Sequence, residues 1–344
     1  MKSLKDEIEQ IMEKVHYAKL FDTWVQNFAI NLNNIWNESS ARELTPNQNN
    51  MNKNSSAIII GKGPSLKKEN HLKILAESDY KGTIVCTDGA LIDCLKAGVT
   101  PKKFPKFFVV SIEARNDSTE NLTGTSHYED GRKITTGDLK TRFDHELVRK
   151  HGNGISGLFS TVTDPGAIDI ARKSGIRICW FHALFDYSDG KKSFNNISAL
   201  MVRTKKHTHG LPGLQTGGNV GTTCWFIAWQ ILKCKNIALI GINHGWNIDD
   251  PLELILSHGH EFPVPEVDKS GPTFEKLFPK IYNPEFNCTC ILDPIFQYYS
   301  KALKEFIRRS PEWVNTINAT EGGIIFGERI SCTKFTTFLE KYTI

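Results

Sequence analysis

The chain has 344 residues, of which 40% are hydrophobic, and it carries a formal net charge of +4 at neutral pH. This length is sufficient to bury a large core, so we expect one large domain with an appendage. The small charge, without a long block of lysine and arginine, argues against a nucleic-acid partner. No apolar run reaches the roughly 18 residues needed to span a bilayer, and the charged start MKSLKDEIEQ is unlike a signal peptide.

The eight cysteines form no C-x-x-C pair. Cys86 and Cys179 lie in apolar runs typical of strands, whereas Cys224 and Cys234 lie in a run typical of a helix. This placement favours buried free thiols over disulfides or a metal site. Free thiols imply a reducing compartment, so the sequence predicts a cytoplasmic protein.

The chain begins with apolar residues at helical spacing over residues 3–36, which predicts a helix. Residues 37–55 are rich in Asn, Ser and Glu and contain Pro46, so we predict a linker or a loosely held loop there. We therefore divide the chain into a helical extension and linker at 1–54 and a main domain at 55–344.

After residue 55, strand and helix signals alternate. The expected strands are 57–60, 83–87, 107–112, 155–160, 176–181, 237–240 and 314–317. The expected helices are 68–77, 90–97, 166–173, 222–232 and 296–309. This order predicts an α/β fold with a Rossmann-like, doubly wound, mostly parallel sheet, and the continuous apolar strands indicate helices on both faces. Its core would be residues 55–245, and the C-terminal part, 246–344, begins with a loop-rich stretch at 246–295.

A Gly-rich turn follows the first expected strand of this sheet, in the motif GKGPSL. Gly61 and Gly63 would let the backbone approach a ligand, Pro64 would fix the turn, and Ser65 could cap a helix or bind a phosphate. The motif is neither a Walker A sequence nor G-x-G-x-x-G, and an ordinary turn is the alternative.

Two carboxylates stand at the ends of the next two strands. Asp88 in TDGA could bind a ribose hydroxyl or a metal, or it could cap the following helix. Glu113 closes the third strand in SIEAR. This pair is smaller than the acidic cluster of a strong magnesium site.

A second Gly-rich loop, TGGNVGT, precedes the helix expected at 222–232. Its glycines and the start of that helix could cradle a phosphate or let a base lie against the backbone. The candidate binding residues here are Thr216, Gly217, Gly218 and Asn219.

A third polar turn, NATEGG, follows the last expected strand. Asn318, Thr320 and Glu321 could close over a base or a ribose. A tight turn with a capping glutamate is the alternative.

The motifs GKGPSL, TDGAL, VVSIEAR, GGNVG…IALIGIN and NATEGG together resemble the MptE-like superfamily. That superfamily includes archaeal 6-hydroxymethyl-7,8-dihydropterin pyrophosphokinases and Maf-type motility-associated glycosyltransferases, and it is similar in fold to bacterial sialyltransferases that use CMP-sialic acid. The motifs cover residues 55–330 and leave the chain before residue 55 uncovered. The resemblance implies a transferase that binds a nucleotide, or a nucleotide-activated donor, across the Gly63 and Gly218 loops.

Two positions depart from that pattern. The relatives usually carry Gly-x-Asp after the last central strand, where this chain has Gly241-Ile242-Asn243. The pyrophosphokinase relatives carry a richer acidic cluster at the third strand, where this chain has Glu113. The first departure weakens any role for a carboxylate there, and the second weakens the kinase interpretation.

The resemblance also implies a general base. In sialyltransferase-like enzymes a histidine downstream of this strand takes that role, and here His258 and His260 follow in SHGHEF. Histidine suits proton transfer because its ordinary pKa lies near neutral pH. The alternatives are plain surface histidines or a metal pair, for which no convincing third ligand is evident. His244, directly after Asn243, is the next candidate.

The sequence supports three alternative hypotheses about the function. The leading hypothesis is a Maf-like or sialyltransferase-like glycosyltransferase with a CMP-type sugar donor and an acceptor that the sequence does not identify. The alternative is a 6-hydroxymethyl-7,8-dihydropterin pyrophosphokinase that uses ATP, with magnesium held by Asp88 and Glu113. The third is a nucleotide-binding protein without catalysis. No metal site is predicted outside the second hypothesis.

Overall fold

The computed structural model describes residues 4–47, 55–114, 126–129, 132–135, 142–184, 193–251, 255, 271–292 and 294–343. Its main sheet contains the strands β1 (Ser39–Ser40), β2 (Ser56–Ile60), β3 (Thr83–Thr87), β4 (Phe107–Ser111), β7 (Ser156–Ser160), β8 (Arg177–Leu184), β9 (Gly213–Gln215), β10 (Asn236–Ile240), β14 (Asn315–Asn318) and β15 (Ile330–Cys332). A three-stranded sheet contains β11 (Trp246–Asn247), β12 (Lys280–Asn283) and β13 (Cys288–Ile291), and a hairpin contains β5 (Ser126–Glu129) and β6 (Arg132–Thr135).

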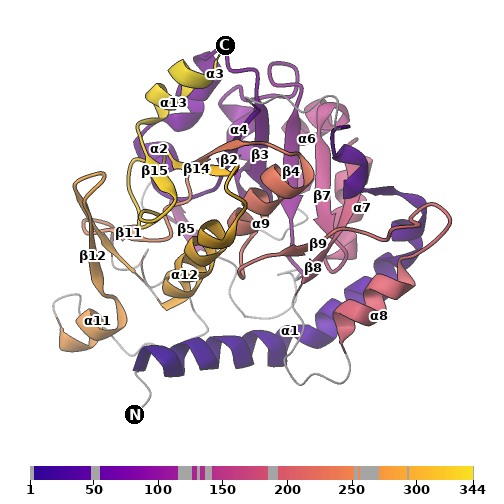
Figure 1. The fold of residues 1–344 in the computed structure, drawn as a ribbon, viewed down its shortest axis with the longest axis horizontal. Helices are drawn as coiled ribbons and strands as arrows, with labels where there is room; N and C mark the ends of the chain where they lie inside the picture. The colour runs from indigo at the N-terminus through magenta and orange to yellow at the C-terminus, as the bar shows by residue number, and fades with distance from the viewer. Residues whose placement is uncertain are drawn as a thin grey trace.

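The order of the main sheet is β1-β8-β7-β4-β3-β2-β10-β14-β15, with β9 paired to β8 (Figure 1). Every pairing between these strands is parallel. The predicted Rossmann-like, doubly wound, mostly parallel α/β fold is therefore confirmed. The expectation of a loop-rich stretch at 246–295 overlooked the three-stranded sheet, because its strands are only two to four residues long.

The helices of the described residues are α1 (Leu4–Asn37), α2 (Ser65–Lys68), α3 (His71–Glu77), α4 (Leu91–Lys96), α6 (Glu146–His151), α7 (Pro165–Lys173), α8 (Phe194–Met201), α9 (Val220–Phe226), α11 (Pro272–Leu277), α12 (Pro294–Arg309) and α13 (Phe335–Tyr342). A π-helical turn at Ile227–Ile231 continues α9. The helix expected at 68–77 is interrupted because Asn70 adopts a left-handed conformation, with φ of 53°. None of the helices in the described part of the chain combines the length and apolar character that a bilayer crossing needs.

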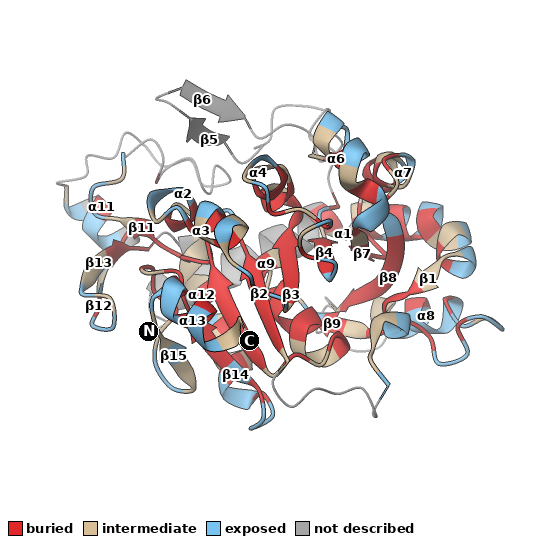
Figure 2. Ribbon diagram, turned by 90° about the horizontal axis from the view of Figure 1, so that it is seen from above, coloured by how far each residue is buried: buried red, intermediate tan, exposed pale blue. Residues whose placement is uncertain are grey.

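The sheet separates two hydrophobic cores, because successive side chains of a strand point to opposite faces. Ile58 and Ile60 of β2 pack in the core that also contains residues of α1, α3, α4, α7 and α13. Ala57 and Ile59 pack in the core that contains residues of α9 and α12. The central strands are consequently buried on both faces (Figure 2). The eight cysteines are free, and six of them are buried, as expected from the sequence.

The N-terminal helix is tightly attached to the main sheet. In α1, the Asn27 amide donates hydrogen bonds to the carbonyl oxygens of Ala114 (2.7 Å) and Val162 (2.9 Å). The Asn31 amide does the same with Thr161 (3.1 Å) and Thr163 (2.9 Å). These carbonyl groups follow the ends of β4 and β7, so α1 crosses the carboxyl edge of the sheet there (Figure 1).

Part of the predicted linker at 37–55 also belongs to the fold, which corrects that prediction. Residues 39–40 form β1, which pairs with Cys179 and Trp180 of β8. Ser40 then caps the 3-10 turn Ala41–Leu44 in a reciprocal capping box with Glu43. This local pairing holds a segment whose polar composition alone suggested a loose loop.

Candidate functional site

The candidate site begins at the point where the order of the strands reverses. From β2 the chain builds β3, β4, β7 and β8 on one side and then returns to place β10, β14 and β15 on the other. In open α/β sheets, ligands bind outside the carboxyl ends of strands at such a switch point. Here the strands at that point are β2 and β10, whose loops are Gly61–Ser65 and Gly241–His244.

Asn243 joins three loops at this point. Its side-chain oxygen accepts hydrogen bonds from the Ser65 hydroxyl (2.9 Å) and, at 3.4 Å, from the Ser65 amide. Its backbone carbonyl accepts from the Ile324 amide at 3.0 Å. A Cβ atom at Gly323 would lie 2.3 Å from that carbonyl oxygen, so the third loop is packed directly against Asn243. The GKGPSL, GIN and NATEGG motifs, far apart in the sequence, therefore meet around one buried asparagine.

The glycines of the first loop serve contacts within the protein. The Gly61 amide donates to the Ile240 carbonyl (2.9 Å), and the Gly63 amide donates to the Gly241 carbonyl (2.8 Å). A Cβ atom at Gly63 would lie 2.3 Å from Asn243 Oδ1. Protein atoms thus accept both N–H groups and fill the space beside Gly63, and ligand binding by these two residues stays a prediction. Pro64 precedes α2, and Ser65 is buried against Asn243.

Lys62 is the exposed cation of the first loop. Its ammonium lies 3.6 Å from Asp93 Oδ2, and the two side chains are about equally exposed, at 38% and 37%. A Cβ atom added at Gly89 would lie 3.7 Å from Lys62 Cδ. Lys62 therefore reaches from β2 across the end of β3, beside Asp88.

Asp88 is buried and already bound by three donors. Its Oδ1 accepts from the Gly89 amide (2.6 Å) and from Arg142 (3.0 Å), and its Oδ2 accepts from the Ser111 hydroxyl (2.6 Å). Glu113 is exposed, and its carbonyl accepts from the Asp164 amide at 3.0 Å. Arg142 also forms an ion pair with the Asp88 carboxylate, and magnesium binding by Asp88 and Glu113 stays a prediction of the kinase hypothesis. Within the described residues, no group of three or more acidic, His or Cys side chains could hold a metal.

The second Gly-rich loop is linked to the first through Ile242. A Cβ atom at Gly61 would lie 2.4 Å from Ile242 Cδ1, and one at Gly221 would lie 2.9 Å from the same atom. Asn219 uses its side-chain oxygen to cap α9, accepting from the Thr222 amide at 2.9 Å. Thr216 in turn accepts from the Gly218 amide at 3.2 Å. The predicted binding residues of this loop are thus near the switch point, with Thr216 and Asn219 engaged in its internal hydrogen bonds.

Gly217 and Gly218 both have positive φ angles, 56° and 82°, which favour glycine. A Cβ atom at Gly218 would lie 2.7 Å from the ring of Tyr299 and 3.1 Å from that of Tyr298, both on α12. The free side of Gly218 is therefore covered by aromatic side chains, and the loop is packed against α12.

The NATEGG turn is held by its own polar groups. Asn318 is fully buried, donates to the Ile325 carbonyl (2.7 Å) and accepts from the Thr320 amide (2.8 Å). The Thr320 hydroxyl donates to the Leu239 carbonyl at 3.1 Å. Glu321 accepts from the Phe335 amide (3.0 Å) and lies 3.4 Å from His71 Nε2. Asn318 and Thr320 are consequently structural, which agrees with the tight-turn alternative.

His244 is the histidine that the described residues place at the switch point. It is buried, has a φ of 46°, and stacks on Phe296 of α12 at a centroid distance of 5.8 Å. A positive φ in a residue other than glycine is often found at functional sites. His258 and His260 lie outside the described residues, so their role as the base stays a prediction.

Two important residues had little or no signal in the sequence. Asn243 was noticed as a departure from Gly-x-Asp, and its position directly after a central strand is the signal that marks it. Arg142 lies 54 residues from Asp88 in the sequence, and no motif connects the two.

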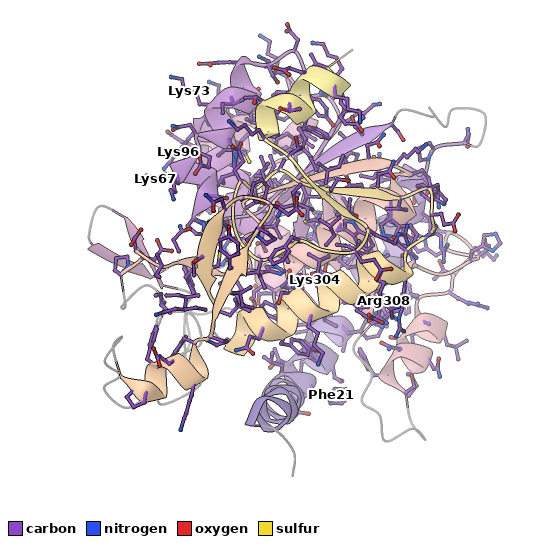
Figure 3. The ribbon with its side chains drawn as sticks, turned by 60° about the vertical axis from the view of Figure 1, so that its left-hand side comes forward. Phe21, Lys67, Lys73, Lys96, Lys304 and Arg308 are labelled. Carbon is purple, nitrogen blue, oxygen red and sulfur yellow. The ribbon has the colours of Figure 1, made fainter. Side chains whose placement is uncertain are left out.

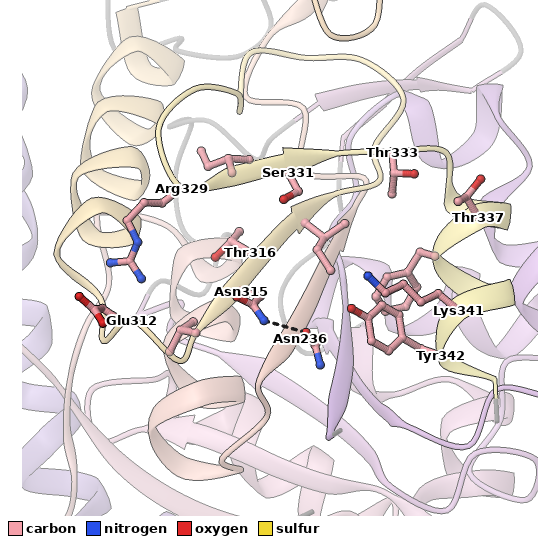
Figure 4. Close-up of a pocket in the computed structure, with 14 residues that line it drawn as sticks. Asn236, Glu312, Asn315, Thr316, Arg329, Ser331, Thr333, Thr337, Lys341 and Tyr342 are labelled. Carbon is pink, nitrogen blue, oxygen red and sulfur yellow. Dashed lines mark hydrogen bonds between the residues drawn. The ribbon is translucent and has the colours of Figure 1, made fainter. Parts of the chain in front are cut away.

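A separate hollow of about 520 Å³ lies beside β14 and β15 under α13 (Figure 4). It is lined by polar groups such as Ser331, Thr333 and Thr337, and it reaches the first residues of β10 and β14, where Asn315 donates to Asn236 at 3.0 Å. Of the predicted site residues that the structure describes, none lines it.

Comparisons with known proteins bear on the family and the fold of this chain. The family model described as 6-hydroxymethylpterin diphosphokinase MptE-like matches residues 26–138, which confirms the resemblance to that superfamily. The match begins within α1, so the expectation that the chain before residue 55 lies outside the resemblance was wrong. A Maf glycosyltransferase from Magnetospirillum magneticum AMB-1 has a similar fold, with a TM-score of 0.50 and 16% identity over 81% of this chain and 33% of that one. No curated protein matches the sequence.

Proposed function

We propose that this chain is a glycosyltransferase that binds a nucleotide-activated sugar, of the CMP type, at the switch point between β2 and β10. The observation that supports this proposal is the meeting of three Gly-containing loops around Asn243 at the carboxyl ends of β2, β10 and β14. The fold shared with a Maf glycosyltransferase is consistent with it. We expect a cytoplasmic location, as inferred from the free thiols.

The donor would lie over the exposed side of this edge, where Lys62 and Arg142 supply positive charge beside Asp88. The acceptor oxygen forms a bond to the anomeric carbon while the bond from that carbon to the phosphate oxygen breaks. A histidine takes the proton of the acceptor hydroxyl, and Lys62 stabilises the negative charge that develops on the departing nucleotide. His258 and His260 are the first candidates for this base, and His244 is the next.

A second candidate function is diphosphoryl transfer from ATP to a pterin alcohol, which the description of the matching family favours. This reaction needs cations around the phosphates, usually magnesium held by carboxylates. The ion pair between Asp88 and Arg142 opposes it, because Arg142 occupies the oxygen that a metal would bind. A nucleotide-binding protein without catalysis is the third candidate.

The nucleotide preference tests these candidates directly. Thermal unfolding of the protein would be followed with CMP, CDP, UDP, GDP, ATP or AMP, each with and without magnesium. We expect CMP to raise the midpoint most, and magnesium to add little. Stabilisation that requires both ATP and magnesium would overturn the proposal in favour of the kinase.

The base is tested by kinetics. We expect His258→Ala or His260→Ala to lower the kcat for release of CMP from CMP-sialic acid by about 10²-fold, the usual scale for a general base. Nucleotide affinity should barely change, because the base acts on the acceptor. His151→Ala, on a half-buried histidine at the end of α6, is the matched control. Full activity in both variants would exclude these two residues and direct the same test to His244.

A further inference from the structure

A groove of about 970 Å³ lies along α12, on the side that faces β12, β13 and residues 324–330. Its volume falls in the range of ligand sites, which is about 300–1,000 Å³. The groove contains none of the residues predicted for nucleotide binding, although Ile324, whose amide binds Asn243, lies in its wall.

One wall of the groove carries a row of cations. Lys301, Lys304 and Arg308 are spaced three and four residues apart, which places them on one face of α12. Figure 3 shows Lys304 and Arg308 on this helix. At a rise of 1.5 Å per residue, the row extends for about 10 Å. Glu305 and Glu328 also line the groove, and Glu305 pairs with Arg308, so Arg308 contributes little uncompensated positive charge.

Lys304 and Arg308 differ in the groups that surround their charges. Arg308 forms a two-point ion pair with Glu305, with distances of 2.9 and 2.7 Å. Within the described residues, the Lys304 ammonium meets no carboxylate, and its neighbour is the ring of Phe326, 4.6 Å from the nitrogen to the centroid. Burial lowers the pKa of Lys304, because a partly dehydrated ammonium is destabilised. An anion bound beside it would offset that cost.

The opposite wall is apolar. Ile281 of β12, Phe326 and Ile330 line it as half-buried side chains, whereas Leu292 and Ile324 of the same wall are already 3% and 2% exposed. A small inorganic anion would leave this surface uncovered, whereas an apolar body would bury it at a gain of about 25 cal/mol per Å². The two walls therefore match the two ends of one amphipathic molecule.

We propose that the α12 groove is a binding site for an amphipathic anion, with its phosphate or carboxylate group at Lys304 and its apolar body against Ile281 and Phe326. This site is distinct from the nucleotide site and does not depend on the proposed transferase activity. Tyr298 and Ala302 line the groove and also lie beside Gly218 and Gly217, so a ligand here would contact side chains that pack against that loop.

Binding of simple probes tests the proposal. Isothermal titration calorimetry would compare dodecyl phosphate, dodecanoate, inorganic phosphate and dodecyltrimethylammonium, with the detergents below their micelle-forming concentrations. We expect dodecyl phosphate or dodecanoate to bind at least about tenfold more tightly than inorganic phosphate or the cationic detergent. The first two probes distinguish a phosphate head from a carboxylate head.

Two variants locate the binding. Lys304→Gln keeps the length of the side chain and removes its charge, and we expect it to weaken the preferred anion by about tenfold or more. Lys67→Gln removes an exposed lysine from α2, away from α12 (Figure 3), and should leave the affinity within about twofold. Thermal unfolding of both variants verifies that they are folded.

Two results would overturn the proposal. One is a wild-type protein that binds the cationic detergent as tightly as the anionic ones, or that binds none of the probes up to about 1 mM. The other is a folded Lys304→Gln variant whose affinity equals that of Lys67→Gln. Because no nucleotide is present, failure here leaves the proposed transferase activity unaffected.

Discussion

Two stretches of the same sheet edge are closed in different ways. At β2, β10 and β14, three loops pack against one another, and Asn243 uses its side-chain oxygen as an acceptor for Ser65. At β4 and β7, the N-terminal helix α1 covers the edge. Its Asn27 and Asn31 use their amide nitrogens as donors to four backbone carbonyl groups. The same residue type therefore performs opposite chemical roles at the two places. The difference shows that a buried asparagine can stabilise a loop through its side-chain oxygen alone or through its side-chain nitrogen alone.

The comparison predicts opposite responses to one substitution. Asn243→Asp keeps the oxygen that Ser65 needs, whereas Asn27→Asp replaces a donor by a carboxylate oxygen facing two carbonyl oxygens. We expect Asn27→Asp to lower the free energy of unfolding by about 3 kcal/mol more than Asn243→Asp does. Urea unfolding of the two variants measures this difference. Asn243→Leu and Asn27→Leu, which remove both ends of the amide, serve as controls and should cost similar amounts. Equal losses in the two aspartate variants would break the comparison.

The close packing at the β2–β10 side is tested by adding one methyl group. A Cβ atom at Gly63 would lie 2.3 Å from Asn243 Oδ1 and 2.7 Å from the Gly241 carbonyl oxygen. We expect Gly63→Ala to cost about 2–3 kcal/mol, because neither neighbour can move without breaking a hydrogen bond. Gly89→Ala is the matched control, since its nearest neighbour would lie 3.7 Å away. Melting curves that place both variants at the same midpoint would show that the loops can separate easily.

The smallest expected effect is a dependence on pH at the NATEGG turn. His71 is buried 3.4 Å from Glu321, and burial lowers the pKa of this histidine, although Glu321 partly opposes the shift. As the pH falls below about 6.5, the unfolded chain therefore takes up a proton before the folded one does. The free energy of unfolding is therefore highest above about pH 6.5. It decreases as the pH falls from there toward the pKa of His71 in the folded protein, by at most about 1.4 kcal/mol per pH unit.

Urea unfolding between about pH 7.5 and pH 5 would measure this slope, and His71→Gln should reduce it. His209→Gln, which changes an exposed histidine, should retain the slope of the parent protein. The prediction fails if His71→Gln and the parent protein lose stability in parallel.

Much of the central sheet could be predicted because its strands are continuous apolar runs. The run at 57–60, for example, lies in β2. The Gly-rich loops could be found because glycine marks close approach, but the sequence does not say whether a ligand or another loop approaches. In the structure, the group that approaches Gly63 is another loop, through Gly241 and Asn243. Asn27 and Asn31 could not be identified, since polar residues on a helix ordinarily face water. β1 and β15 were missed because two or three residues carry no measurable periodicity.

The outer edge of β8 has a consequence for the behaviour of the protein at high concentration. β8 is eight residues long, and a strand of this length with a free edge is a template on which a second copy can add a strand. Ser39–Ser40 pair with its middle, and Gly213–Gln215 pair with His182–Leu184 near its end. The His182 amide donates to the Pro212 carbonyl, whereas the Phe181 carbonyl accepts from Thr161 on the β7 side, so both short strands cover the edge away from β7. Two brief segments from distant parts of the chain thus protect the protein from edge-to-edge aggregation, and neither is long enough to recruit a further strand itself.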